Sequence, residues 1–311
     1  MSKLQWVVAP SESGERLDRF LAQADRLGSR AKAATAIERG KVFLNEDEAG
    51  RSSGAGRLRT GDVVRVWMDR PGSARARARV PRAGQLDILF EDAVLLVVNK
   101  PAGLLAVPIG AKEDAISLAD LVRVHLRSQG KVQPQVVHRI DRDTSGLVVF
   151  AKTALAQQRL KEQFKRREPE RVYQAVVYGH PDPPEGTWSD RLVWDQRSLI
   201  QKSTHPRDPQ GKDALSDYRV VRRFRDASLI EVRLITGKRN QIRLQARLRG
   251  HTLVGEQRYT YGPSTLRPID FPRQALHAWR LGFRHPVDDR SLQFEAPLPE
   301  DMTDLLRGLE R

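Results

Sequence analysis

Apolar positions in the first part of the chain recur with helical spacing. Four of them are three or four residues apart: Leu17, Phe20, Leu21 and Ala24. This spacing predicts an amphipathic helix. Ser29 and Gly40 are suited to begin and end a second helix, because serine caps helix N-termini and glycine ends helices. Strands are predicted at residues 41–46 and 63–68. Residues 1–68 are therefore expected to form a small α+β domain.

From residue 86 to residue 311, predicted strands and helices alternate. Strands are predicted at 87–92, 95–101, 135–141, 147–152, 171–179, 228–237 and 292–297. Helices are predicted at 117–129, 155–168 and 301–310. Several strands alternate polar and apolar residues, which is typical of antiparallel sheets with one covered face. The expected fold class is α+β, with a mixed, largely antiparallel sheet and packed helices in this second domain.

Residues 69–85 separate the two predicted domains. They contain proline, glycine, small residues and five arginines, with no apolar periodicity. Such a composition predicts a basic flexible linker. It can act as a solvated spacer, as a cationic strap on RNA phosphates, or as both.

Charge narrows the choice of partners. The chain has 311 residues and a formal net charge of +15, which favours a polyanion through Coulomb attraction and counterion release. Nucleic acid is the first candidate and an anionic membrane surface the second, although charge alone is also compatible with no specific partner. The N-terminus lacks the pattern of a signal peptide, and no apolar run is long enough to span a membrane. We therefore expect a cytoplasmic protein.

Absent residue types exclude several chemistries. The chain has no cysteine, which rules out disulfides, thiolate zinc sites and cysteine nucleophiles. The seven histidines show no metal-ligand spacing, and no P-loop or dinucleotide-binding glycine pattern occurs. We therefore expect neither a metal nor a cofactor.

The segment HRIDRDTSGLVVFAK, residues 138–152, places a carboxylate on a tight turn. Asp141 follows a predicted strand and is flanked by Arg139 and Arg142. Thr144 and the residues after it favour a turn. Positive neighbours favour the ionised carboxylate that a nucleophile needs. On physical grounds alone, an arginine–aspartate turn that only stabilises a loop is the favoured interpretation, because such pairs are common at protein surfaces.

Three other segments have ordinary explanations when taken singly. Asn99 and Lys100 precede a Pro-Gly turn, and Tyr173 fits a core position of a strand. Residues 234–259 fit a basic surface helix. His277 and His285 are interpreted as structural.

Taken together and in order, these segments resemble the RluA family of pseudouridine synthases. The resemblance lies in HRIDRDTSG, NKPAG, RVYQAVVYG and LITGKRNQIRLQ. It implies that Asp141 is the catalytic aspartate, that Tyr173 is the active-site tyrosine and that Arg243 pairs with the aspartate. Expected substrate-binding residues are Arg139, Asn99, Lys100, Thr144, Leu234 and Gln241, with Ile235 as a further pocket residue.

The chain departs from the family pattern at several positions. Asn240 and Gln245 stand where histidines are usual, and Lys238 replaces an arginine. Glu256 replaces an aspartate, and Val107 replaces a frequent histidine. These changes leave the aspartate–arginine pair intact and bear on substrate choice.

The first domain resembles the RNA-binding domain named after a small-subunit ribosomal protein, the S-four type. The resemblance lies in ERLDRFLA, SRAKAATAIERGKVFLN and LRTGDVVRVW. Expected RNA contacts are Arg30, Lys32, Arg39 and Lys41 here, with Lys238 and Arg239 in the second domain.

The expected function is the isomerisation of specific uridines in RNA to pseudouridine, by a monomer and without cofactor or metal. Family members with this pair of domains usually act on large-subunit ribosomal RNA, which is therefore the expected substrate. Transfer RNA is the alternative. Three rivals remain: a non-catalytic RNA-binding or ribosome-assembly factor, a carboxylate-dependent glycosidase that pairs Asp141 with Asp143, and a basic peripheral membrane protein. The sequence leaves open whether Asp141 attacks the ribose or the pyrimidine ring.

Overall fold

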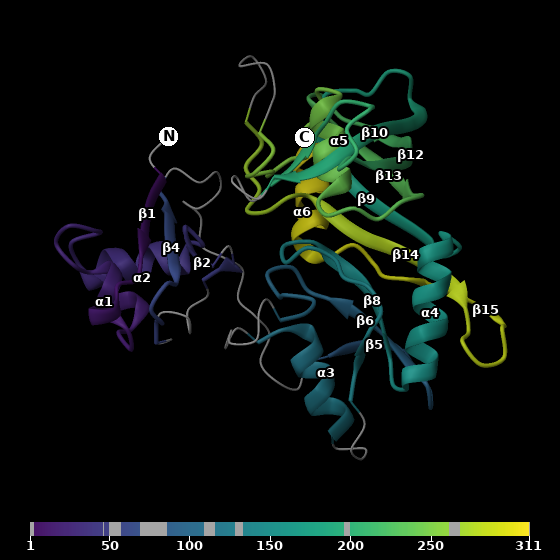
Figure 1. The fold of residues 1–311 in the computed structure, drawn as a ribbon. Coiled ribbons are helices and arrows are strands. Elements are labelled where there is room, and N and C mark those ends of the chain that lie inside the picture. The colour runs from purple at the N-terminus through teal and green to yellow at the C-terminus, as the bar shows by residue number, and fades with distance from the viewer. Residues whose placement is uncertain are drawn as a thin grey trace. The chain divides into compact units, whose positions relative to one another are not determined.

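The structure is a computed structural model. It describes residues 3–45, 47–49, 57–68, 86–108, 116–127, 133–195, 200–260 and 268–310. The predicted linker at 69–85 lies outside the described residues. The chain divides into two compact units (Figure 1). One is formed by the described residues up to 68 together with residues 108 and 116–117, and the other by the remaining described residues from 86 on.

The first unit is a four-stranded antiparallel sheet with two helices. Its strands β1 (Lys3–Val7), β2 (Val42–Leu44), β3 (Asp47–Glu48) and β4 (Val63–Trp67) are ordered β1-β4-β2-β3. The chain also forms a 3-10 turn η1 (Pro10–Glu12) and helices α1 (Leu17–Leu21) and α2 (Arg30–Glu38). Phe20 and Ile37 of the helices pack with Val64 and Val66 of β4.

The two helices of this unit follow the predictions to different extents. Ser29 caps α2, accepting a hydrogen bond from the backbone N–H of Lys32 at 3.2 Å. The first predicted helix is shorter than expected, because α1 ends at Leu21 and Ala24 is exposed. Gly28, with a φ of 73°, lets the chain turn before α2.

The second unit is built on an eleven-stranded sheet. Its strands are β5 (Asp87–Glu91), β6 (Leu95–Lys100), β7 (Gln135–Val136), β8 (Ser145–Ala151), β9 (Glu170–Tyr178), β10 (Glu185–Asp195), β11 (Ile200–Ser203), β12 (Lys212–Arg223), β13 (Ala227–Leu234), β14 (Leu276–Arg284) and β15 (Ser291–Glu295). The order is β11-β10-β12-β13-β9-β14-β8-β6-β5, with β15 on β14 and β7 on β8. Only β14 and β8 pair in parallel among the described strands. The expected α+β class with a mixed, largely antiparallel sheet is confirmed.

Helices cover both faces of this sheet. They are α3 (Leu118–Arg127), α4 (Ala154–Arg166), α5 (Gln241–Leu248) and α6 (Glu300–Leu309). In β6, Leu96 and Val98 pack in the cluster that includes α3 and α5, whereas Leu95 and Val97 pack with α4. Burial on both faces explains why β6 and β8 are continuous apolar runs without alternation.

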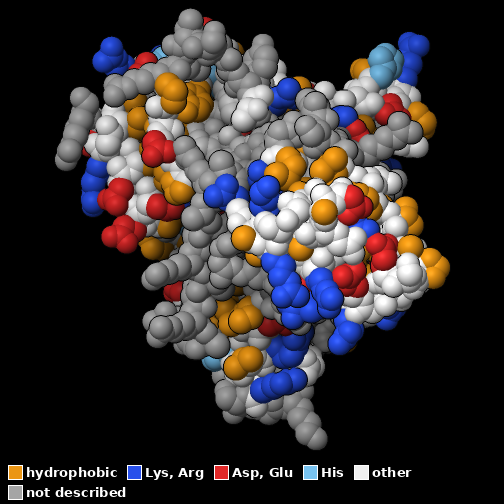
Figure 2. Space-filling view, turned by 90° about the vertical axis from the view of Figure 1, so that its left-hand side faces the viewer, with side chains coloured by type: hydrophobic (Ala, Val, Ile, Leu, Met, Phe, Trp, Pro, Cys, Tyr) orange, Lys and Arg blue, Asp and Glu red, His pale blue; other side chains and the backbone are white. Residues whose placement is uncertain are grey.

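Basic side chains on the surface are consistent with the positive net charge of the chain. On the face drawn in Figure 2, several Lys and Arg side chains gather in the lower half of the view. None of the helices in the described part of the chain is both long and apolar enough to cross a lipid bilayer.

Candidate active site

Asp141 lies on a loop between β7 and β8. The predicted strand 135–141 is wrong at its end, because β7 stops at Val136 and the following residues leave the sheet. Thr144 N–H donates to the Asp141 carbonyl at 3.2 Å and closes the turn. Gly146 follows with a φ of 112°, and a Cβ there would lie 2.2 Å from the Ala278 carbonyl oxygen. Only glycine therefore lets β8 approach β14 this closely.

Two buried cations brace this turn through its carbonyl groups. The ammonium of Lys100 donates to the carbonyls of Pro101, Leu104 and Arg142 at 2.8–2.9 Å. Arg273 donates to the carbonyl of Asp143 at 3.1 Å. Burial lowers the pKa of Lys100 to about 7.

Lys100 is therefore placed differently from the expectation that it binds substrate. Its side chain is 0% exposed, and three backbone carbonyls use the three hydrogens of its ammonium. It fixes the shape of the loop that carries Asp141.

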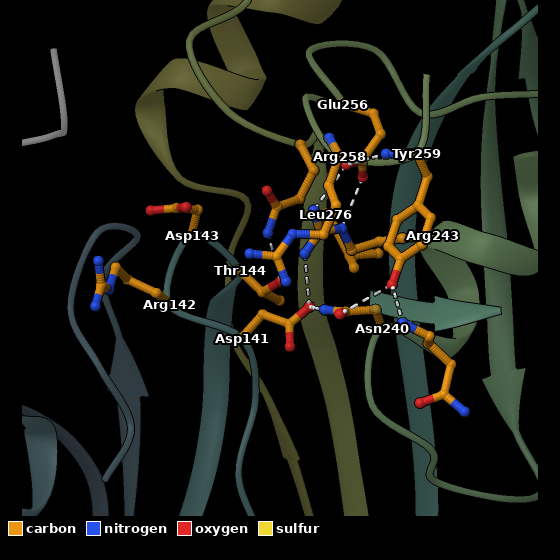
Figure 3. Close-up of polar contacts among 12 residues, drawn as sticks. Asp141, Arg142, Asp143, Thr144, Asn240, Arg243, Glu256, Arg258, Tyr259 and Leu276 are labelled. Carbon is orange, nitrogen blue, oxygen red and sulfur yellow. Dashed lines mark hydrogen bonds and ion pairs between the residues drawn. The ribbon is translucent and has the colours of Figure 1, made fainter. Parts of the chain in front are cut away.

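The carboxylate of Asp141 meets two donors from a segment about a hundred residues away. Asn240 Nδ2 donates to Asp141 Oδ2 at 2.7 Å, and the Arg243 guanidinium donates to the same oxygen at 3.1 Å (Figure 3). Both donors lie at the start of α5. The Asp141 side chain keeps 26% of its surface exposed, so the carboxylate is reachable from the pocket.

Glu256 fixes Arg243 from the other side. Its two carboxylate oxygens accept from Nε and from the second terminal nitrogen of Arg243, both at 2.7 Å. Glu256 Oε1 also accepts from the backbone N–H groups of residues 257–259 at 2.7–3.1 Å. Although burial opposes ionisation, the charge and hydrogen bonds of Arg243 leave the pKa of Glu256 below its ordinary value.

Burial and hydrogen-bond donors also have opposite effects on the pKa of Asp141. Burial alone would raise its pKa, but the charge and hydrogen bond of Arg243 and the hydrogen bond of Asn240 lower it further than burial raises it. A smaller lowering comes from Arg258. These contributions exceed any from the flanking Arg139 and Arg142, which the sequence had suggested as the cause, and Arg142 points away in Figure 3.

Tyr173 lies on β9 on the face that carries α3 and α5. It is 8% exposed. Burial and the nearby Asp141 raise the pKa of Tyr173 to about 12, although Arg171 opposes this shift. The hydroxyl therefore stays protonated near neutral pH and is suited to donate a hydrogen bond.

Asp141, Tyr173, Asn240 and Arg243 line a pocket of about 640 Å³. Of the residues predicted to bind substrate or RNA, the pocket contains Arg139, Thr144, Leu234, Gln241, Lys238 and Arg239, together with Asp141, Tyr173, Ile235 and Arg243. Arg139 and Arg239 are exposed, and the charge of Arg239 stacks over the ring of Trp194 at 4.1 Å. The rim is therefore rich in positive charge.

Two further expectations differ from the structure. Asn99 does not line the pocket; its amide donates to Asp87 on the neighbouring strand at 2.9 Å. Gln241 lines the pocket, but its oxygen accepts from Thr236 and from Lys238 N–H, and its nitrogen donates to three groups on β12 and α5. These hydrogen bonds occupy its amide, so Gln241 holds the loop in shape, and its contact with substrate stays a prediction.

Arg171 and the end of α4 line the pocket, although the sequence did not mark them as site residues. Arg171 is two residues before Tyr173 on β9, so both point to the same face. Its guanidinium reaches the carbonyls of Leu234 and Ile235 at 3.3–3.4 Å, and its buried Nε has no hydrogen-bond partner among the described residues. Phe164, Lys165 and Arg167, at the end of α4, also line the pocket. The signal for Arg171 was its spacing from Tyr173.

The expected RNA contacts of the first unit are accessible. Arg30, Lys32 and Arg39 are exposed, and Lys41 is half-buried. Lys41 donates to the carbonyl of Met68 at 2.5 Å. Their contact with RNA stays a prediction.

The arrangement supports chemistry with one ionised carboxylate. Asp143 is directed away from Asp141 in Figure 3, so the two do not form the carboxylate pair of a glycosidase. Within the described ranges, no group of three or more His, Asp or Glu side chains is arranged to hold a metal ion.

Comparisons with known proteins agree with this geometry. Residues 94–248 match the family model described as RNA pseudouridylate synthase. The chain is 34% identical over 315 residues to the uncharacterised RNA pseudouridine synthase YlyB of Bacillus subtilis strain 168, covering 100% of this chain and 99% of that protein. It is 37% identical over 309 residues to the ribosomal large subunit pseudouridine synthase D of Zymomonas mobilis, covering 95% and 94%.

A solved structure shares the fold. The human RNA pseudouridylate synthase domain containing 4 superposes with a TM-score of 0.59 at 20% identity, over 71% of this chain and 92% of that one. Identity over nearly the whole length, added to this shared fold, places the chain in the RNA pseudouridine synthase family, as an enzyme of the RluA type.

Proposed function

We propose that this enzyme converts specific uridines of large-subunit ribosomal RNA to pseudouridine, with Asp141 as the catalytic carboxylate. Relatives with this substrate in their names align over nearly their full length, including the synthases D of Zymomonas mobilis and Salmonella typhimurium. The observation that carries the site assignment is the ionised, partly exposed Asp141 carboxylate held by Arg243 at 3.1 Å in the pocket.

In this proposal each pocket residue acts on a uridine that has left the RNA stack, which costs a few kcal/mol. Asp141 acts at the sugar or the ring, Arg243 orients it, and the Tyr173 ring contacts the base. Arg139, Lys238 and Arg239 bind phosphates and help to offset the cost of extrusion. Thr144 and Leu234 line the pocket wall.

The first unit is proposed to be an S-four type RNA-binding domain over residues 1–68, followed by the linker 69–85 and the catalytic domain 86–311. The exposed cations of α2 support this assignment, because a basic helix on a small domain suits an RNA backbone. A monomeric enzyme is part of this proposal. With ribosomal RNA as substrate, the enzyme acts in the cytoplasm.

Pseudouridine mapping across total RNA tests the proposal. Cells lacking the gene are complemented with wild type, Asp141→Asn or Asp143→Asn. We expect a site in large-subunit ribosomal RNA that wild type and Asp143→Asn restore and Asp141→Asn does not. A restored site in transfer RNA would change the substrate, and restoration by Asp141→Asn would remove Asp141 from the catalytic role. No change at any site would favour a binding factor.

A further inference from the structure

We infer that Asn240 is a positioning residue which, together with Tyr259, commits the Oδ2 oxygen of Asp141 to hydrogen bonding and leaves Oδ1 as the oxygen that acts on the uridine. This inference rests on the proposed role of Asp141. It assigns a function to a position where the chain departs from the family pattern.

The two oxygens of the Asp141 carboxylate are not equivalent. Oδ2 accepts from Asn240 at 2.7 Å and from Arg243 at 3.1 Å. No described residue donates a hydrogen bond to Oδ1, and Figure 3 shows this oxygen directed away from both donors. Since the side chain keeps 26% of its surface exposed, Oδ1 is the oxygen available to a ligand in the pocket.

Tyr259 decides which end of the Asn240 amide faces Asp141. The Tyr259 hydroxyl accepts from the backbone N–H of Gln201 at 3.0 Å and lies 3.2 Å from Asn240 Oδ1. Because a backbone N–H can only donate, the hydroxyl directs its own hydrogen to Asn240 Oδ1. The amide nitrogen is then left to face Asp141.

A backbone group therefore sets the direction of a buried relay. Hydrogen bonds run from Gln201 to Tyr259, then to Asn240, and end at Asp141 Oδ2. Tyr259 is 2% exposed and Asn240 7%. In such surroundings an alternative amide orientation would leave buried polar atoms without partners, at a substantial cost.

The backbone at residue 240 limits which side chains can supply this donor. Asn240 has φ 53° and ψ 24°, just before α5, and its side chain makes no capping bond to the helix. Asparagine, aspartate and histidine are the side chains most tolerant of this left-handed region. Of these, only asparagine supplies an N–H donor that does not titrate, so the donor is present at every pH.

The consequence for the reaction concerns one atom. During isomerisation the bond from ribose C1′ to uracil N1 breaks and a bond from C1′ to C5 forms. The C5 hydrogen leaves to solvent, and N1 gains a proton, so substrate and product are isomers. Whether Asp141 bonds to the substrate or accepts a proton from it, Oδ1 is the atom involved, because both donors hold Oδ2.

Tritium release tests this assignment. The probe is total RNA from cells lacking the gene, labelled with [5-³H]uridine and mixed with excess enzyme, so that each C5 bond formed releases tritium to water. The single variants are Asn240→Ala, Asn240→His and Tyr259→Phe. The double variant combines Tyr259→Phe with Asn240→Ala. The matched control is Tyr178→Phe, whose hydroxyl contacts only the backbone of Ile269 in the described structure.

We expect Asn240→Ala to lower the saturated rate about 10- to 100-fold, the effect of one hydrogen bond to a charged group. The enzyme concentration at half-saturation should stay within about two-fold, and the acid limb of the rate profile should move to higher pH. Asn240→His should restore most of the rate. Tyr259→Phe should be slower than wild type and should add nothing to Asn240→Ala, because both act through one relay.

Several results would overturn the inference. The first is a wild-type rate and pH profile in Asn240→Ala. The second is a rate for Asn240→His that is as low as the rate for Asn240→Ala. The third is that the effects of Tyr259→Phe and Asn240→Ala on the rate are additive. If Asn240→Ala does not fold, judged by circular dichroism, a wild-type rate and pH profile in Tyr259→Phe overturns it equally. An active Asp141→Asn variant would instead remove the proposed function on which the inference rests.

Discussion

Glu256 holds Arg243 with two hydrogen bonds of 2.7 Å, whereas Arg243 reaches Asp141 with one of 3.1 Å. The orientation of the guanidinium is therefore set by Glu256, and Asp141, the proposed catalytic residue, meets a cation that is already in place. A rigid cation costs no reorganisation when charge changes on the aspartate.

Glu256→Gln should remove this clamp. Glu256 is fully buried as a side chain. Asp141 still compensates the charge of Arg243 in this variant, but the glutamine amide has one acceptor oxygen, so a buried donor of Arg243 loses its partner and the free energy of unfolding should fall by about 1–3 kcal/mol. Urea denaturation measures it, with Glu310→Gln as the control. Glu310 pairs with Arg222 at the surface, and its loss should change stability by less than about 1 kcal/mol. Equal stability of the two variants would show that the clamp carries little energy.

Asp141 and Tyr173 should not make the rate depend on pH over a wide range. The pKa of Asp141 lies below its ordinary 3.8, so this group loses its charge only as the pH falls through that lowered value. The pKa of Tyr173 is about 12, so its hydroxyl keeps its proton until the pH rises to that value. Neither group should therefore change the single-turnover rate between about pH 5 and pH 9.5, and a change near pH 7 would report the loss of a proton from Lys100, whose pKa is about 7. An acid limb near pH 6 would mean that Arg243 and Asn240 do not outweigh burial.

Salt dependence should identify the phosphate contacts. Lys238→Gln and Arg239→Gln should each reduce the slope of log affinity against log salt by about 0.7–0.9, as expected for one lost phosphate contact. Arg30→Gln and Lys32→Gln test the first unit in the same way. Fluorescence anisotropy with a labelled fragment of large-subunit ribosomal RNA measures the slope, with Arg222→Gln as the control. An unchanged slope would place that residue outside the RNA interface.

Gly146→Ala should destabilise the catalytic unit severely. Its φ of 112° and the 2.2 Å approach to Ala278 leave no room for a Cβ, and strain together with a backbone clash should cost more than about 3 kcal/mol. Gly250→Ala is the matched control, since Gly250 has a φ of 78° and nothing within 4 Å of the added carbon. It should cost only about 1 kcal/mol in thermal unfolding. If the two variants melt alike, the close approach of β8 and β14 is not rigid.

The elements with a clear apolar period were predictable. The helix expected at 155–168 is α4 (Ala154–Arg166), and the strand expected at 171–179 is β9 (Glu170–Tyr178). The sequence did not predict β10 (Glu185–Asp195) and β12 (Lys212–Arg223), although they are the two longest strands described. Many of their residues are charged and lie on an exposed face, so pairing between strands stabilises them more than an apolar pattern does.

The candidate site was predictable where a motif marks a residue and not where tertiary contacts assign its role. Asp141 and Arg243 were identified from the sequence and are in contact. Lys100, however, was expected to bind substrate and is fully buried under the catalytic loop. Nothing local distinguishes an ammonium that meets a ligand from one that meets three carbonyls. Asn240 was noted only as a departure, because its partner Asp141 is 99 residues away.

The bracing of the Asp141 turn by Arg273 also links the shape of this turn to the last helix that the structure describes. Arg273 supports the Asp143 carbonyl and is itself held by Asp301 of α6, at 2.7 and 2.9 Å. Contacts that join residues so far apart form late, after the intervening chain has been synthesised. A nascent chain still lacking α6 therefore carries Asp141 without its support. We expect the turn that carries Asp141 to reach its final shape only after α6 has been synthesised, because Arg273 then has its partner Asp301.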